Sequence, residues 1–118
     1  MIVESVELKD YRNYEFLDMN FNEHVNIIYG DNAQGKTNIL ESIYMCSTSK
    51  SHRGSKDREI VRFGEDESHI KLNVLKHGMK YRIDMHLKKN KTKGIAVNGI
   101  PIKKAVEPVS YTHLTLPT

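Results

Sequence analysis

The chain has 118 residues, of which 28% are charged and 38% hydrophobic, and a formal net charge of +3. This length permits one small domain or a piece of a larger one, and the composition is ordinary for a globular protein. One cysteine excludes an intrachain disulfide framework, and the sequence contains neither a membrane-length apolar run nor a signal-peptide core, so we predict a cytoplasmic protein.

The N-terminal segment predicts two strands. Apolar and charged residues alternate loosely over residues 2–8, which indicates a half-buried first strand. Residues 10–14 interrupt the alternation, and residues 16–21 predict a second strand. Arg12 lies in the interruption and has two interpretations. It is either a solvated charge at a strand end or a guanidinium that grips phosphate oxygens or stacks on a nucleotide base.

A glycine motif follows, between a predicted strand and a predicted helix. The motif G-x-x-x-x-G-K-[ST] consists of Gly30, Asp31, Asn32, Ala33, Gln34, Gly35, Lys36 and Thr37. A β-branched run at residues 25–29 precedes it and indicates a buried strand. Apolar residues at helical spacing follow it at Ile39, Leu40, Ile43 and Tyr44, with the polar residues Glu41 and Ser42 between them. A chance match in a turn would not require these flanking elements, so the context favours a phosphate-binding P-loop.

The chemistry of phosphate binding explains why these residue types are needed at this spacing. Gly30 and Gly35 permit backbone angles that a Cβ would forbid, so that successive N–H groups can surround an anion. Lys36 can reach the β- and γ-phosphates, and the Thr37 hydroxyl can bind Mg²⁺. A helix that begins at about Gly35 would direct its positive end at the same phosphates. We therefore predict a nucleotide site.

The segment after this helix is polar and basic. Residues 47–56 have no apolar periodicity and should lie on the surface, either as a solvated loop or as a contact for DNA phosphates or a partner's nucleotide site. Residues 57–63 predict a short helix that ends at Gly64. Cys46, on the preceding helix, is predicted to be a packing residue rather than a nucleophile.

Two β-hairpins are predicted next. Residues 70–74 and 81–87 alternate between apolar and polar types around a turn at 77–78, which indicates a hairpin with one solvated face. Residues 95–97 and 100–102 flank Asn98-Gly99, a strong signal for a two-residue hairpin turn.

The turn between these hairpins is rich in lysine. Residues 88–94 include four lysines, which form either a phosphate-binding patch or the soluble tip of a hairpin. No aromatic residues are interleaved with them, so we predict no base-stacking platform there. A zinc site is also not predicted, because no metal-ligand spacing relates Cys46 to His24, His52, His69, His77 or His86.

The last ten residues differ from the rest of the chain. Residues 109–118 carry no charged side chain apart from a protonated His113, and they resemble the translated end of a transposase-type sequencing adaptor. We predict that this decapeptide is an artefact and exclude it from the fold; a genuine loop is the alternative.

Several stretches of residues 1–108 together resemble the RecF family of bacterial DNA replication and repair proteins. The stretches are Leu8-Lys9-Asp10-Tyr11-Arg12-Asn13-Tyr14, Gly30 to Thr37 with Asn38, Ser51-His52-Arg53, residues 57–64 and Val97-Asn98-Gly99-Ile100-Pro101. Asn-Ala-Gln inside the glycine motif, followed by Thr-Asn, resembles the RecF side of the ABC-type ATPases that include SMC and Rad50. The tripeptide Ser-His-Arg after the helix is still more specific to the RecF family.

The resemblance implies an α/β fold, a P-loop NTPase of the ABC/SMC-like type in which β-hairpins surround a strand–P-loop–helix unit. Residues 1–108 would be the incomplete N-terminal part of that ATPase domain. ATP and Mg²⁺ are the implied ligands, with Lys36 on the phosphates and Thr37 on Mg²⁺. The resemblance gives weaker support for Arg12, His52 and Arg53 as nucleotide or DNA contacts.

The resemblance also implies a biological role. RecF-like proteins form an ATP-dependent homodimer, bind single-stranded or gapped DNA, help RecO and RecR to load the recombinase RecA, and support the SOS response. A weak, DNA-linked ATPase activity is expected of a full-length protein but not of this chain, because the family's signature, Walker B and switch-histidine motifs lie beyond its last residue. No catalytic residue is therefore assigned.

Two other classes of function stay open. One is a different P-loop enzyme, such as a small-molecule kinase, although the predicted hairpins replace the plain βαβ repeat that such an enzyme would show. The other is a non-hydrolysing, nucleotide-gated binding module.

Overall fold

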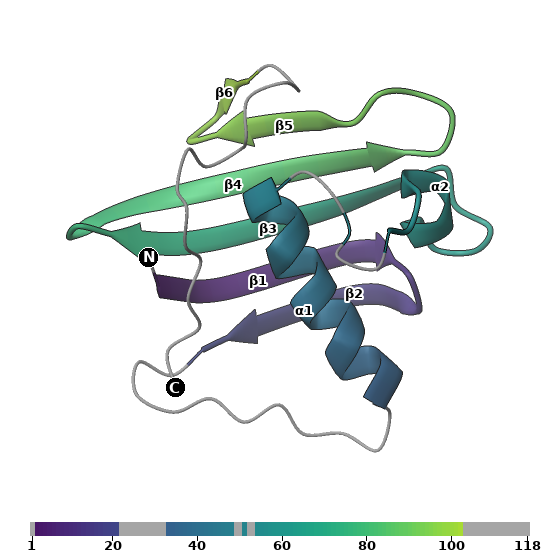
Figure 1. Cartoon of the computed structure of the whole chain (residues 1–118), viewed down its shortest axis with the longest axis horizontal. Helices are drawn as coiled ribbons and strands as arrows, with labels where there is room; N and C mark the ends of the chain where they lie inside the picture. Colours follow the sequence, from purple (N-terminus) through teal and green to yellow (C-terminus); the bar gives the residue numbers. More distant parts are fainter. Residues whose placement is uncertain (1, 22–32, 49–50, 52–53, 103–118) are drawn as a thin grey trace.

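The computed structural model describes residues 2–21, 33–48, 51 and 54–102, and it describes only the backbone of residues 33–35. One long helix crosses one face of an antiparallel sheet (Figure 1). The elements are β1 (Ile2–Tyr11), β2 (Tyr14–Asn20), α1 (Ala33–Thr48), α2 (Asp57–Ile60), β3 (Glu67–Lys76), β4 (Met79–Lys88), β5 (Gly94–Val97) and β6 (Ile100–Pro101). No helix in this part of the chain has the length and apolar character needed to cross a bilayer.

The strands form one six-stranded sheet in the order β2-β1-β3-β4-β5-β6. Every neighbouring pair is antiparallel. Leu8 lies opposite Ile70, and Ile70 lies opposite Met85, so apolar side chains of adjacent strands reach the same face. Because successive residues of a strand point to opposite faces, the other face receives the polar residues.

The hydrophobic core lies between α1 and one face of the sheet. The helix contributes Ile39, Ile43 and Cys46, which are buried, and Leu40 and Tyr44 remain exposed. The buried sheet residues are Val3, Val6, Leu8, Tyr11, Ile70, Leu72, Val74, Ile83, Met85, Leu87 and Ile95. Cys46 is thus confirmed as a packing residue, and burial raises the pKa of its thiol.

Both predicted C-terminal hairpins are confirmed. His77 and Gly78 join β3 to β4 with φ angles of +51° and +75°, and Asn98 and Gly99 join β5 to β6 with φ angles of +52° and +81°. Two consecutive positive φ values match the twist of the flanking strands, which explains the glycine at the second position of each turn.

The boundaries of the other elements differ from the predictions. β1 continues to Tyr11 and β2 begins at Tyr14, so the predicted interruption at residues 10–14 is only a two-residue turn. α1 begins at Ala33 rather than at about Gly35, and α2 ends at Ile60 rather than at residue 63. Helix ends are set by local hydrogen bonds, which composition does not reveal. The predicted strand at residues 25–29 lies outside the described residues.

Candidate nucleotide site and the adjacent buried ion pair

The glycine motif is partly visible at the beginning of α1. Gly30, Asp31 and Asn32 lie outside the described residues, whereas residues 33–35 form the first turn of the helix. Lys36 and Thr37 follow in the same turn region and are half-buried. The N–H groups of a first helical turn have no partner within the helix, so in α1 these donors belong to the motif itself. A helix N-terminus favours an anion, and it is the part of a phosphate site that the described residues include.

Asn38 connects this end of α1 to the β1–β2 turn. The buried Asn38 side chain donates from Nδ2 to Asn13 Oδ1 at 3.0 Å. A groove of about 610 Å³ opens beside this contact, and we name it the Arg12 groove. Its lining consists of Arg12, Asn13, Asn38, Arg58, Glu59, Val61, Phe63 and Lys89. Three cationic side chains and the almost fully exposed ring of Phe63 therefore lie close to the helix end that carries the motif.

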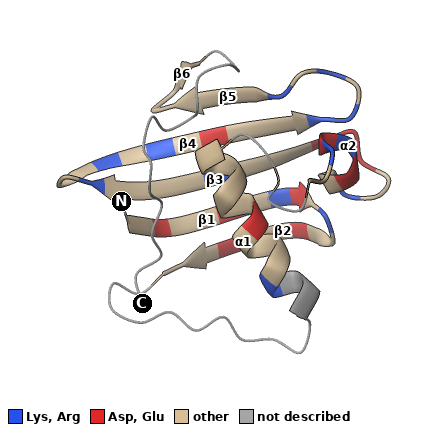
Figure 2. Ribbon diagram, viewed as in Figure 1, with Lys and Arg blue, Asp and Glu red and all other residues tan. Residues whose placement is uncertain are grey.

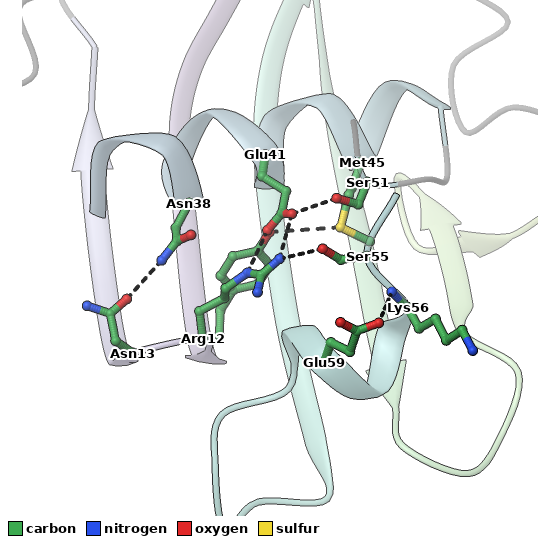
Figure 3. Close-up of polar contacts among 10 residues, drawn as sticks. Arg12, Asn13, Asn38, Glu41, Met45, Ser51, Ser55, Lys56 and Glu59 are labelled. Atoms are coloured by element: carbon green, nitrogen blue, oxygen red, sulfur yellow. Dashed lines mark hydrogen bonds and ion pairs between the residues drawn. The ribbon is translucent and has the colours of Figure 1, made fainter. Parts of the chain in front are cut away.

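A set of short polar contacts meets at Glu41, in the middle of α1 (Figure 3). Tyr11 Oη donates to Glu41 Oε1 at 2.7 Å, and Arg12 spans both carboxylate oxygens through Nε at 2.9 Å and Nη2 at 2.8 Å. The Ser51 hydroxyl donates to Oε2 at 2.6 Å, and Arg12 Nη2 also donates to Ser55 Oγ at 2.9 Å. These five residues, the Glu41 cluster, join β1, α1 and the segment after α1.

The cluster holds a charged carboxylate away from water. Glu41 has 0% exposure, and burial by itself would raise the pKa of its carboxyl. Hydrogen bonds from its partners, led by Arg12, outweigh that effect and lower the pKa to about 2, so the side chain is ionised. The pKa of Tyr11 is raised, first by burial and then by its hydrogen bond to Glu41, which keeps the phenol protonated.

The backbone of Arg12 is anchored as firmly as its side chain. Its φ is +51°, a value that non-glycine residues adopt rarely. The Arg12 N–H donates to Ile60 O at 2.7 Å, and the Arg62 N–H donates to Asp10 O at 2.8 Å, so the end of α2 and the residues after it hold the β1–β2 turn in this conformation. Arg12 is therefore not the freely solvated charge of the first interpretation, because the ion pair leaves its side chain only 19% exposed.

Sequence reasoning missed the role of Glu41. The pattern marks it only as a polar residue between apolar positions of the helix, whereas it is as buried as they are. The available signal was its spacing, because Glu41 lies one helical turn before the buried Met45 and shares its face. Its partner, Arg12, is 29 residues away in the sequence, so no local pattern identified the pair.

The remaining predicted contacts are only partly visible. His52 and Arg53 lie outside the described residues, although Ser51 and Ser55 on either side belong to the Glu41 cluster. Of the four lysines in the β4–β5 turn region, Lys93 is structural, since its Nζ lies 3.1 Å from Asp57 Oδ1 and its side chain is 8% exposed.

The other lysines of that region gather near α2 (Figure 2). Together with residues of α2 they line a hollow of about 530 Å³, named the basic hollow here. Its lining comprises Lys56, Asp57, Arg58, Lys88, Lys89, Asn90, Lys91 and Thr92. Five cationic side chains and one acidic side chain leave this surface positively charged.

Comparisons with known proteins agree with this geometry. RecF, the DNA replication and repair protein of Lachnospira eligens, is 99% identical over 107 residues, which are 91% of this chain and 30% of that protein. The chain thus spans about a third of the length of that relative. A solved structure described as the recombination mediator protein RecF-ATP in the RecFOR pathway matches with a TM-score of 0.80 and 37% identity over 86% of this chain and 28% of that one.

The fold extends to a second group of proteins. The SMC head domain of Thermotoga maritima shares it, with a TM-score of 0.72 and 20% identity over 87% of this chain and 39% of that one. These neighbours confirm the predicted ABC/SMC-like P-loop NTPase fold. A family model described as an AAA domain matches residues 5–112, and the chain therefore belongs to the AAA domain family as a RecF-type member.

Proposed function

We propose that this chain is the ATP-binding N-terminal part of a RecF-type protein of DNA replication and repair. The observation that carries the proposal is the position of the glycine motif at the beginning of α1, with Lys36 and Thr37 in the first turns of the helix. A solved RecF structure that contains ATP and is similar to this chain supports the same assignment.

The motif residues fit a magnesium-bound triphosphate. The N–H groups of residues 33–35 face the open end of α1, where the helix dipole favours an anion. Lys36 would place its ammonium group on the β- and γ-phosphates, and Thr37 would bind the Mg²⁺ ion, which neutralises phosphate charge. Gly30, Asp31 and Asn32 complete the loop in this proposal.

The Arg12 groove would receive the rest of the nucleotide. It begins at Asn38, directly after Thr37 on α1, and extends to Phe63. Arg12 and Arg58 offer planar guanidinium groups, and Phe63 offers a ring face, all of which can stack on a base. Because Arg12 is fixed by Glu41, it would present this surface without losing side-chain entropy on binding.

DNA binding belongs to the same proposal and uses the basic hollow. Lys56, Arg58, Lys88, Lys89 and Lys91 converge there, and lysine and arginine are the usual ligands of DNA phosphates. His52 and Arg53 are further candidate contacts. In a full-length protein we propose an ATP-dependent homodimer in the cytoplasm that binds single-stranded or gapped DNA with RecO and RecR, loads RecA, supports the SOS response and hydrolyses ATP weakly.

Nucleotide binding is tested in a full-length RecF that carries this N-terminal sequence, called the full-length protein below. Lys36→Ala should weaken the binding of a fluorescent ATP analogue by at least about tenfold, because the triphosphate loses its main side-chain counter-charge. Thr37→Ala should remove the dependence of that affinity on Mg²⁺. The matched control is Lys80→Ala, because Lys80 is an exposed lysine near the beginning of β4. Unchanged affinity in Lys36→Ala would refute the P-loop assignment.

DNA binding is tested separately by its salt dependence. Alanine at Lys88, Lys89 and Lys91 should reduce the slope of log affinity against log salt by about one unit for each phosphate that the protein no longer neutralises. Alanine at Lys71, Lys76 and Lys80 changes the net charge equally on another part of the sheet and is the control. Equal slopes in the two triple variants would show that the basic hollow does not bind DNA, without affecting the ATP proposal.

A further inference from the structure

Two histidines and a glutamate lie together on the face of the sheet that α1 does not cover. Glu67 and His69 are two residues apart on β3 and therefore point to the same face. His86, on β4, is the direct cross-strand partner of His69. The next residues of these strands, Ile70 and Leu87, point to the core, which places the three side chains on the opposite, open face.

The potential ligand atoms of these residues are close together. One carboxylate oxygen and one nitrogen from each imidazole all lie within 4.8 Å of one another. The two imidazole rings are stacked, with centroids 4.2 Å apart and an interplanar angle of 21°. His86 Nε2 lies 3.2 Å from Glu67 Oε1.

The Nε2 atom of His86 is the unexplained member of this group. It is covered from solvent, yet it has no hydrogen-bond partner of acceptable geometry within the described part of the chain. The nearby Glu67 oxygen, at 3.2 Å, does not form a hydrogen bond with it. Buried polar atoms are almost always paired, so an unpaired nitrogen beside a second imidazole and a carboxylate indicates a missing binding partner.

We propose that Glu67, His69 and His86 bind a divalent transition metal ion of the Zn²⁺ class. Two imidazoles and one carboxylate are a donor set that proteins use for zinc and for related ions, and three protein ligands leave at least one coordination position open. Tetrahedral zinc with ligands at about 2.0–2.1 Å places its ligand atoms roughly 3.4 Å apart. In this proposal, rotation of the three side chains brings their ligand atoms from the observed separations of up to 4.8 Å to this shorter spacing.

The surrounding charges select the class of ion. Lys9 is the cross-strand neighbour of His69, and Lys88 is that of Glu67, so two cationic side chains flank the site. The hollow beside the site also contains three acidic residues and two more lysines, so that charges of both signs surround it: Asp10, Glu65, Asp66, Lys89 and Lys91. The binding free energy must therefore come from coordinate bonds to nitrogen rather than from net negative charge. This favours Zn²⁺, Ni²⁺ or Cu²⁺ over Mg²⁺ and Ca²⁺, which prefer oxygen ligands.

The experiment is a calorimetric titration of the full-length protein with Zn²⁺ in the presence of excess Mg²⁺. We expect one saturable equivalent that Mg²⁺ does not displace. Glu67→Gln, His69→Ala and His86→Ala should each weaken that equivalent by at least about tenfold, since each removes one of three ligands. His77→Asn, a substitution at the exposed β3–β4 turn that tolerates a positive φ, should leave it unchanged.

The design also separates loss of a ligand from loss of the fold. Glu67 is 53% exposed, so Glu67→Gln, which keeps the size of the side chain, should retain the far-ultraviolet circular dichroism and the ATP affinity of the parent protein. The proposal is overturned if the parent protein has no saturable equivalent, or if Glu67→Gln binds Zn²⁺ as tightly as the parent. It is also overturned if His77→Asn loses as much affinity as the His69 and His86 variants.

Discussion

The two faces of the sheet carry ion pairs of the same chemical kind in opposite environments. On the covered face, Arg12 and Glu41 lie 2.8 Å apart with side chains that are 19% and 0% exposed. On the open face, Lys71 and Glu7 lie 3.6 Å apart with side chains that are 43% and 37% exposed. Water solvates both charges of the second pair whether or not they meet. In the first pair, protein groups have replaced most of the water around the two charges, so removal of either partner leaves the other charge buried without a counter-charge.

The largest effect should come from breaking the buried pair. Glu41→Ala leaves the Arg12 guanidinium without its counter-charge and removes the acceptor of the Tyr11 hydroxyl. We expect the free energy of unfolding of the full-length protein to fall by about 3–5 kcal/mol, the range for an uncompensated buried charge. Urea denaturation followed by circular dichroism measures this loss, and Glu7→Ala is the control on the open face. A loss below about 1 kcal/mol would show that the two pairs are equivalent.

The pH dependence of stability sharpens the same contrast. The folded structure lowers the pKa of Glu41 from 4.5 to about 2, so the unfolded chain takes up the proton first as the pH falls. The stabilisation is fully present above pH 4.5 and is lost progressively between pH 4.5 and about pH 2.

The measurement for this prediction is a series of urea denaturations of the parent protein and of Glu41→Gln at decreasing pH. The difference between their free energies of unfolding should shrink over that window, because glutamine does not titrate. A difference that stays constant would mean that folding does not lower the pKa of Glu41.

An intermediate effect is expected at Lys93, whose pair with Asp57 is partly covered. The two side chains are 8% and 26% exposed, and their 3.1 Å contact connects the β4–β5 segment to α2. Lys93→Ala should lower the free energy of unfolding by about 1.5–3 kcal/mol, the range for a hydrogen bond to a charged group. Lys91→Ala, at an exposed position of the same segment, should change it by less than about 0.5 kcal/mol. Equal effects of the two substitutions would contradict a structural role for Lys93.

The smallest effect should come from the open-face pair. A double-mutant cycle over Glu7→Ala and Lys71→Ala should give a coupling energy of about 0–1 kcal/mol that decreases with added salt. A coupling as large as that of Arg12 with Glu41, or one insensitive to salt, would remove the distinction between the faces.

Elements whose signals are local could be predicted from the amino-acid sequence. Alternation of apolar and polar residues predicted β3 and β4, and Asn98-Gly99 predicted the turn between β5 and β6, because period and turn geometry depend on neighbouring residues. The glycine motif likewise predicted a helix after it, and α1 occupies that position. The signals for these helices and turns come from neighbouring residues, so these predictions succeeded to within a few residues.

Which distant residues meet, in contrast, depends on tertiary packing. β1 pairs with β3, although α1 lies between these two strands in the sequence. This pairing brings Arg12 to Glu41 and fixes the depth at which the carboxylate is buried. The spacing of histidines along the chain likewise did not indicate that His69 and His86 are neighbours, because only the register of β3 and β4 brings them together. The contacts of a buried charge are set by sheet order and register, which depend on packing over the whole molecule rather than on the residues beside it.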